Sequence, residues 1–358
     1  MHLLNIDTFF IIEKVVLVLV LVLVAFGVAA YATWAERKVA AIMQDRIGPL
    51  RAGPFGLLQP LADGGKLFFK EEINPDRSTK WIFMLAPAAF MVVALMACVI
   101  TPWGPSFTMN IGGTIRTIDL HVADVNVGVL LVFAIVSVGL YGIMLGGWAS
   151  NNKFSLLAAI RAASQAISYE LALGLSLIAL VMMSGTLSLK EIVEAQKGFW
   201  DGSYFTWNVF KQPLGFVIFF VCALAELNRA PFDMPESESE LNTGYLLEYS
   251  SMKQGMFMFA EYINLFFTSV LLSTLYFGGY NFPFMDVVAA AVPGWVFSLI
   301  CFGALMTKAV GFILFIMALR WTLPRFRFDQ VLKLGWTGLI PLALVNLLIT
   351  GAIIVFLN

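Results

Sequence analysis

Four carboxylates stand inside or at the ends of long apolar segments, and they are the residues best placed to do chemistry. They are Glu36, Glu170, Glu226 and Glu261. A charge in hydrocarbon is costly, so an acid in such a segment indicates a function by default. Burial and proximity to another acid make a carboxyl group retain its proton, which allows protons to pass between neighbours. The four acids therefore predict a proton relay.

The competing interpretation is that each acid forms a separate structural ion pair. Arg161, Arg229 and Lys253 are available partners in the sequence. Lys308 is the only charge near the middle of its apolar segment. It is a candidate partner for one of the acids or a candidate proton site of its own.

An acidic segment over residues 229–253 supplies further candidates for proton transfer. Aromatic and leucine residues, among them Phe232, interrupt its acids. A purely solvated loop has no need of such apolar residues, so this segment is predicted to fold against the bundle or a partner. The relay candidates within it are Asp233, Glu236, Glu238 and Glu240.

Redox chemistry on metals is not indicated by the cysteines and histidines. The chain has 3 cysteines and 2 histidines, and no two cysteines lie at a metal-ligand spacing. An iron–sulfur cluster needs about four thiolates. No dinucleotide-binding or phosphate-binding glycine loop is present either. Any electrons that this protein helps to transfer are therefore expected to reside on another subunit.

Transmembrane helices are the elements that must position these residues. The composition is 60% hydrophobic and only 13% charged, against roughly 25% charged residues in soluble domains. Apolar runs of about 20 residues recur along the chain, as bilayer spans require. We predict an all-α, polytopic membrane protein with one transmembrane domain over residues 1–358. The eight predicted spans are 10–33, 81–101, 124–148, 163–184, 213–230, 256–277, 296–319 and 336–357.

The positions of Lys and Arg predict the orientation. Sixteen of them fall in the loops on one side of the predicted spans and five on the other, and positive loops stay cytoplasmic. Both termini are then periplasmic, and the four acids lie in the cytoplasmic half, with Glu170 roughly 10 Å inside its span. The outer half is nearly free of ionisable groups, so a relay must continue sideways into another membrane subunit. The predicted cytoplasmic loops are about 37–80, 149–162, 231–255 and 320–335.

The first of these loops mixes leucines and phenylalanines with glycines and charges. One interpretation is a short amphipathic helix that lies in the membrane interface. The other is an ordinary loop packed on the bundle, and the sequence leaves both open.

Several blocks of sequence resemble one known family. Residues 35–49 (AERKVAAIMQDRIGP) and 53–63 (GPFGLLQPLAD) resemble the first cytoplasmic loop of the H subunit of bacterial respiratory complex I, the NADH:quinone oxidoreductase. Its mitochondrial equivalent is called subunit 1. Residues 161–170 (RAASQAISYE), 225–236 (AELNRAPFDMPE) and 323–330 (LPRFRFDQ) resemble later parts of it. The blocks occur in family order and spacing, so the resemblance covers essentially the whole chain.

The resemblance implies a function and a setting. It implies a multi-pass protein of the bacterial inner membrane that encloses the quinone tunnel where the hydrophilic arm meets the membrane. Quinone is then the substrate, and the iron–sulfur clusters and FMN are held only by partner subunits. The buried acids look like the family's proton channel, which leads from the quinone cavity towards the antiporter-like subunits. The partners that the resemblance implies are these subunits, the quinone-site hydrophilic subunits and the small membrane subunits.

Cations at the predicted cytoplasmic span ends are candidates for the tunnel mouth, because the planar fork of arginine holds a carboxylate with two bonds. The competing interpretation is positive-inside anchoring. The tunnel and loop candidates are Arg46, Arg229, Phe232, Lys253, Arg320, Arg325 and Arg327.

The chain departs from the family pattern at three positions. The family usually has glycine at Ser251, an aromatic or apolar residue at Gln254, and an apolar residue at Gly65. These departures concern the shape of the quinone-facing loops.

Two other hypotheses compete with complex I. The first is the related membrane subunit of an energy-converting hydrogenase, which uses no quinone. The second is a self-contained ion transporter, against which stands the lack of an inverted repeat or of paired broken helices.

Overall fold

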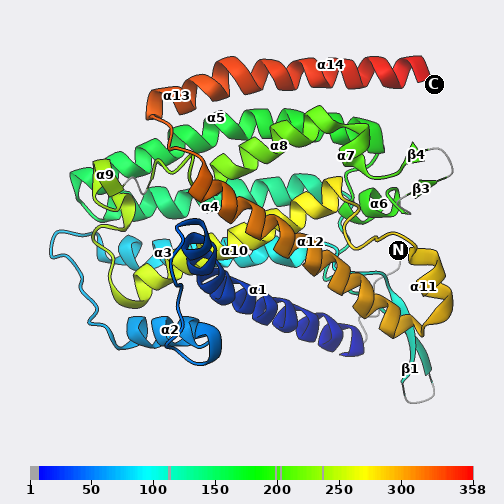
Figure 1. Cartoon of the computed structure of the whole chain (residues 1–358), viewed down its shortest axis with the longest axis horizontal. Coiled ribbons are helices and arrows are strands. Elements are labelled where there is room, and N and C mark those ends of the chain that lie inside the picture. Colours follow the sequence, from blue (N-terminus) through cyan, green and yellow to red (C-terminus); the bar gives the residue numbers. More distant parts are fainter. Residues whose placement is uncertain (1–7, 112–113, 198–199, 202–203, 236–237, 358) are drawn as a thin grey trace.

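A computed structural model of the chain describes residues 8–111, 114–197, 200–201, 204–235 and 238–357. Long helices run side by side along one direction, with short elements and loops gathered at the two ends (Figure 1). The long helices are α1 (Thr8–Met43), α3 (Lys80–Ile100), α4 (Gly128–Ala149), α5 (Lys153–Ser184), α10 (Ser251–Tyr276), α12 (Gly294–Thr322) and α14 (Ile340–Leu357).

Seven helical segments are long and apolar enough to cross a membrane, and a shorter apolar helix, α8 (Pro213–Glu226), lies among them. The seventh segment, Phe328–Phe356, joins α14 to the helical turns before it. The prediction of an all-α, polytopic membrane protein is confirmed. At 14 residues, α8 is roughly 21 Å long, shorter than the roughly 30 Å hydrocarbon core. Its last residue, Glu226, therefore ends the helix inside the bundle.

Short elements connect the long helices. The helical ones are η1 (Pro54–Gly56), α2 (Gln59–Phe69), α6 (Leu189–Glu194), α7 (Asn208–Lys211), α9 (Glu238–Leu241), η2 (Gly244–Leu246), α11 (Met285–Ala291), α13 (Phe328–Lys333) and the π-helical η3 (Leu334–Leu339). Two small antiparallel hairpins, unforeseen in the sequence, pair β1 (Phe107–Ile111) with β2 (Thr114–Ile118) and β3 (Trp200–Asp201) with β4 (Tyr204–Phe205).

Helix α5 begins about ten residues before the predicted span, inside the stretch 149–162 that was expected to be a loop. The side chain of Asn152 caps it by accepting a hydrogen bond from the Phe154 amide at 2.9 Å, which satisfies a free donor of the first turn. The long helix carries Glu170 roughly 25 Å from its first residue, Lys153. Glu170 thus lies much further along its helix than the expected two turns.

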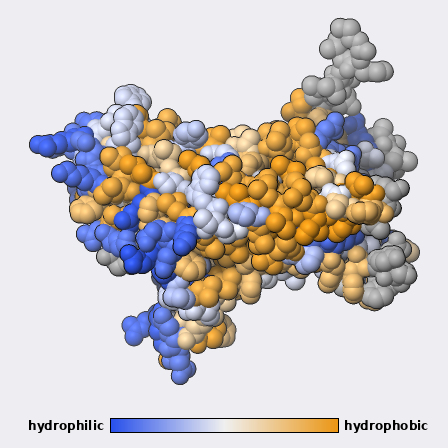
Figure 2. All heavy atoms as spheres, turned by 90° about the horizontal axis from the view of Figure 1, so that it is seen from above, coloured by the Kyte–Doolittle hydropathy of each residue, from blue (hydrophilic) through white to orange (hydrophobic). Residues whose placement is uncertain are grey.

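The bundle has two distinct ends. We call them the α2 end, where α2, α9 and the acidic segment lie, and the α6 end, where α6, α7 and α11 lie (Figure 1). Helix α1 begins and α14 ends at the α6 end. Hydrophobic side chains cover the middle of the bundle, and hydrophilic ones gather at the α2 end (Figure 2). This distribution is that of a protein whose middle faces lipid.

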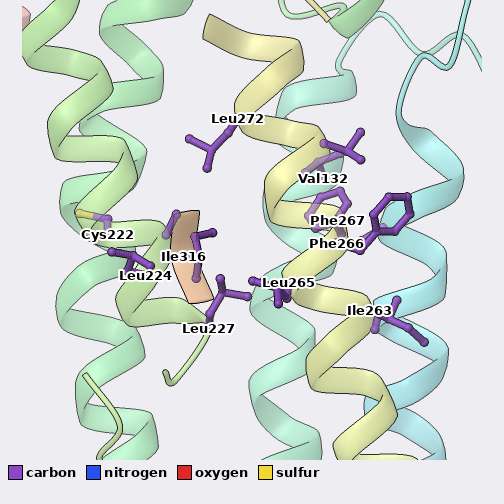
Figure 3. Close-up of a cluster of buried hydrophobic side chains, with 14 of the residues drawn as sticks. Val132, Cys222, Leu224, Leu227, Ile263, Leu265, Phe266, Phe267, Leu272 and Ile316 are labelled. Carbon is purple, nitrogen blue, oxygen red and sulfur yellow. The ribbon is translucent and has the colours of Figure 1, made fainter. Parts of the chain in front are cut away.

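The centre of the bundle is packed with apolar side chains from α4, α8, α10 and α12. Leu224, Leu265 and Ile316 are among the buried residues that meet there (Figure 3). Small residues let helices approach closely in membranes. A Cβ added at Gly142 of α4 would lie 2.7 Å from the Cβ of Phe90 on α3, so only glycine permits this contact.

One departure from the family pattern has a structural explanation at the start of α10. Ser251 has a left-handed backbone, with φ 55°, and only glycine adopts this region without a steric cost. The Ser251 hydroxyl donates a hydrogen bond to the Leu67 carbonyl of α2 at 3.0 Å. This hydrogen bond to α2 offsets the steric cost of serine in the left-handed backbone at position 251.

Candidate functional site

Glu36 is held by two arginines at the α2 end of the bundle. Its Oε2 atom accepts from Arg229 at 2.7 Å and from the Tyr262 hydroxyl at 2.8 Å. Arg320 donates to the other carboxylate oxygen. The guanidinium of Arg229 also lies 4.3 Å from the centroid of the Tyr262 ring. Glu36 is therefore paired with arginines, and among the described residues no hydrogen bond joins it to the other three acids.

Glu36, Tyr262 and Arg320 line a cavity between α1, α2, α10 and α12, which we call the α2 cavity, and Arg229 lies behind this wall. The volume of the cavity is about 330 Å³. Three further charged residues on its wall are Arg37, Arg46 and Asp63. Phe259 and Trp321 supply aromatic surface. Helix α2 lies on the far side of the cavity, so the first loop contains a helix, as one of the two interpretations predicted. An ion pair of 2.8 Å between Arg37 and Asp63 ties α2 to α1, so it also packs on the bundle.

Three acids meet at a second, interior cavity, which we call the acid cavity. Glu170 of α5, Glu226 of α8 and Glu261 of α10 all line it. Its volume is about 80 Å³, and each water molecule needs roughly 10–15 Å³ measured in this way. The cavity therefore has room for several water molecules between carboxyl groups from three helices.

Polar neighbours accompany these acids inside the bundle. The Ser137 hydroxyl of α4 donates to Glu170, and the Tyr245 hydroxyl donates to Glu261 at 2.5 Å. Asn264 also lines the acid cavity. Within the described residues, no Lys or Arg lies within ion-pair distance of Glu170, Glu226 or Glu261. Separate ion pairs thus do not account for these three acids.

Helix α10 forms the wall between the two cavities. Glu261 lines the acid cavity, and the next residue, Tyr262, lines the α2 cavity. Successive residues on a helix point about 100° apart, which explains how neighbours face different spaces. The distance between the two cavities is therefore the thickness of one helix.

The acidic segment folds against the bundle, as predicted. Asp233 forms an ion pair of 2.5 Å with Arg325, and Glu240 forms one of 2.6 Å with Arg161. The amide nitrogen of Gln165 donates to the carbonyls of Ala225 at 2.6 Å and of Phe232 at 2.8 Å. Gln165 thereby connects the end of α8 to this segment. Glu236 and the side chain of Glu238 lie outside the described residues.

The remaining predicted cations and Phe232 occupy different surroundings. Lys253 pairs with Glu72 at 2.6 Å. Phe232 is buried and packs on Tyr169 and Phe326. Arg327 is 78% exposed and lies 3.9 Å from Asp329, so it belongs to neither cavity.

Lys308 contacts no acid among the described residues. Its ammonium donates to the carbonyls of Phe277 at 2.7 Å, Gly279 at 2.9 Å and Asn281 at 2.5 Å. It also lies 4.5 Å from the centroid of the Trp207 ring. A cation satisfied by carbonyls just after the C-terminus of α10 stabilises that helix end, and the expectation of a Lys308–acid pair is wrong.

Sequence reasoning missed the polar partners of the acids. Tyr262 and Tyr245 bind Glu36 and Glu261, and Ser137 binds Glu170. Only Tyr262 carried a usable signal, since it directly follows an acid inside a predicted span.

Comparison with known proteins agrees with these features. Residues 15–351 match the NADH dehydrogenase family. The chain is 53% identical to an H subunit of the NADH-quinone oxidoreductase of Cytophaga hutchinsonii, over 96% of this chain and 97% of that protein. It is 54% identical to the H subunit from Flavobacterium psychrophilum, over 96% and 98%. It is 45% identical to an H subunit from Geobacter sulfurreducens, over 96% and 94%.

These matches extend over nearly the full length of both partners and therefore decide among the three hypotheses. Together with the multi-pass helical fold, they show that the chain belongs to the H-subunit family of NADH-quinone oxidoreductase and is a membrane subunit of respiratory complex I.

Proposed function

We propose that this subunit forms the membrane part of a quinone-binding tunnel and passes protons away from it through buried carboxyl groups. The observation that carries the proposal is the acid cavity, where acids from three helices share one water-sized space. It stands one helix away from a cavity lined by arginines and aromatic residues. Iron–sulfur clusters and FMN then belong to partner subunits of the hydrophilic arm.

The α2 cavity suits a quinone. A ligand site of this kind combines apolar and aromatic walls with a few polar groups that orient the ligand. Here Phe259 and Trp321 provide the apolar surface, and Arg46 and Arg320 provide hydrogen-bond donors. Exposed apolar side chains on α2, such as Leu61 and Phe68, suit a helix that rests on lipid beside the entrance.

The acid cavity suits a relay. A carboxyl group transfers a proton directly or through one water molecule, and the cavity has room for such water between the acids. Reduction of a quinone takes up protons and places negative charge beside the Glu36 cluster. That charge acts on the ion pair between Asp233 and Arg325 and, across α10, on Glu261. We infer that Glu36, Asp233, Glu236, Glu238 and Glu240 serve the quinone end and that Glu261, Glu226 and Glu170 carry protons towards neighbouring membrane subunits.

The tunnel assignment can be tested by filling the α2 cavity. Gly64 lines it, and a side chain added there meets no atom within 4 Å. We expect Gly64→Trp to raise the KM for quinone several-fold, because the indole occupies ligand space. Reduction of a soluble acceptor by NADH should stay normal. The measurement is steady-state kinetics of isolated membranes with a short-chain quinone.

Gly65→Trp is the matched control. Gly65 is the next residue of the same helix, also has open space, and does not line the cavity. The family often has an apolar residue there, so bulk is acceptable. Equal quinone kinetics in the two variants would refute the tunnel assignment.

The orientation of the subunit follows from the same proposal. We infer that the α2 end faces the cytoplasm, where the hydrophilic arm docks, and that the α6 end and both termini face the periplasm. The excess of Lys and Arg in the loops of the α2 end supports this orientation.

Topology reporters test this orientation directly. After Asn358, a reporter that is active only in the periplasm should be active. At Asp76, a reporter that is active only in the cytoplasm should be active. Placement of both reporters on one side of the membrane would contradict the arrangement of eight spans.

A further inference from the structure

Several apolar side chains line the acid cavity towards the α6 end of the bundle, and one of them, Leu189, also borders a second space. Leu189, the first residue of α6, lines the acid cavity on one side. On its other side it lines a second space, of about 10 Å³, which we call the histidine pocket. Leu189 is the residue that both linings share. A space of this size holds about one water molecule.

The histidine pocket has ionisable side chains among its mainly apolar walls. His121 lines it and is 6% exposed, and neither of its ring nitrogens has a hydrogen-bond partner among the described residues. Burial, and secondarily the Lys190 ammonium, lowers the pKa of His121 to about 4. The imidazole is therefore neutral, with one donor and one acceptor nitrogen free to bind water. Asp124 and Lys190, which form an ion pair of 3.5 Å, also line the pocket.

Leu189 is fixed tightly in its position. It is 3% exposed. It lies beside Gly128 at the start of α4, where an added Cβ would be 3.4 Å from the Leu189 Cγ. The Val129 amide donates to the Leu187 carbonyl at 3.0 Å and joins the two segments. The leucine is thus wedged between two spaces that can both hold water.

We propose that Leu189 is a proton seal, which stops protons in the acid cavity from escaping through the histidine pocket to the α6 face. The proposal rests on the proposed relay in the acid cavity. Proton transfer over distance needs an unbroken chain of polar groups or water, and an apolar constriction breaks such a chain by excluding water. Protons in the acid cavity then have no polar route out through Leu189.

The test uses the intact complex in proteoliposomes. We expect Leu189→Ala to speed the decay of an imposed pH gradient several-fold in the absence of NADH, because water can bridge the two spaces. Fewer protons should accumulate per quinone reduced. Leu180→Ala is the matched control, since Leu180 is fully buried in α5 and lines neither space. A Leu189→Ala complex as tight as the Leu180→Ala complex would overturn the proposal.

Two further variants make the test specific. Leu189→Ala combined with His121→Leu should be tight again, because the pocket loses the groups that bind water. An unchanged leak in the double variant would overturn the route through His121. Leu189→Val, a smaller change, should also speed the decay of the pH gradient, but less. It provides the test if the alanine variant assembles poorly. Pumping by the wild type and its loss in Glu226→Gln, measured alongside, report on the relay independently of the seal.

Discussion

Glu226→Gln and Glu170→Gln should each leave the complex assembled but cut quinone-linked turnover and proton pumping together by roughly tenfold or more, as loss of a proton-transfer group does. Glutamine keeps the shape and hydrogen bonding of the side chain but cannot ionise. Both acids line the acid cavity, and neither has a basic partner within ion-pair distance among the described residues. Their removal therefore leaves no cation without a counter-charge, and assembly is preserved.

The measurement is NADH:quinone activity and pH-gradient formation in membranes, both normalised to assembled complex. Asp329→Asn is a suitable control, because this acid is 75% exposed and lies away from both cavities. It should behave like the wild type. Full activity with full pumping in both glutamine variants would reduce these acids to structural polar groups and refute the relay.

Arg229→Ala should abolish most quinone reduction while NADH still reduces a soluble acceptor at the normal rate. Arg229 is 6% exposed and binds Glu36 at 2.7 Å. Breaking a buried ion pair by removal of one partner typically costs about 3–5 kcal/mol. Here Arg320 continues to hold Glu36, so the loss should fall at the lower end. The expected result is a distorted wall of the α2 cavity in a complex that still assembles.

Two variants separate charge from tunnel shape. Arg229→Lys keeps the charge but lacks the planar fork that lies over Tyr262, so it should recover assembly better than quinone activity. Arg327→Ala removes an exposed arginine outside both cavities and should be neutral. If Arg229→Ala lost quinone reduction and soluble-acceptor reduction in equal proportion, the cause would be failed assembly. Quinone kinetics like those of the wild type would refute a role of Arg229 in the tunnel.

The two predictions act on opposite sides of α10. Glu261 and Tyr262, adjacent in the chain, face the acid cavity and the α2 cavity respectively. A rotation or shift of this one helix changes both cavities at once. This arrangement gives a short physical route by which charge at a quinone could alter the protonation of the three acids.

The sequence by itself determined the class of protein. Apolar runs of membrane-spanning length are a local property of the chain, and they predicted the membrane helices. Their bounds differ in places, because α5 begins before its predicted span and α8 ends before the end of its own. The blocks at residues 35–49 and 225–236 are also local, and they sufficed to indicate the family. The same local signals identified Glu170, Glu226 and Glu261 as unusual, because a charge in an apolar run is visible without any knowledge of packing.

Only the tertiary structure decided which of these residues meet. The sequence treated Glu36 as equivalent to the other acids, but the fold gives it two arginines. Arg229, from the segment after α8, is 193 residues away, and Arg320, from α12, is 284 residues away. Lys308 was a candidate partner for an acid or a candidate proton site, and the structure shows it bound to carbonyls beyond the end of α10. Neighbours across helices depend on how each helix is rotated and how far it extends. The sequence of one span, about 20 residues long, gives neither the rotation of its helix in the bundle nor the position where that helix ends.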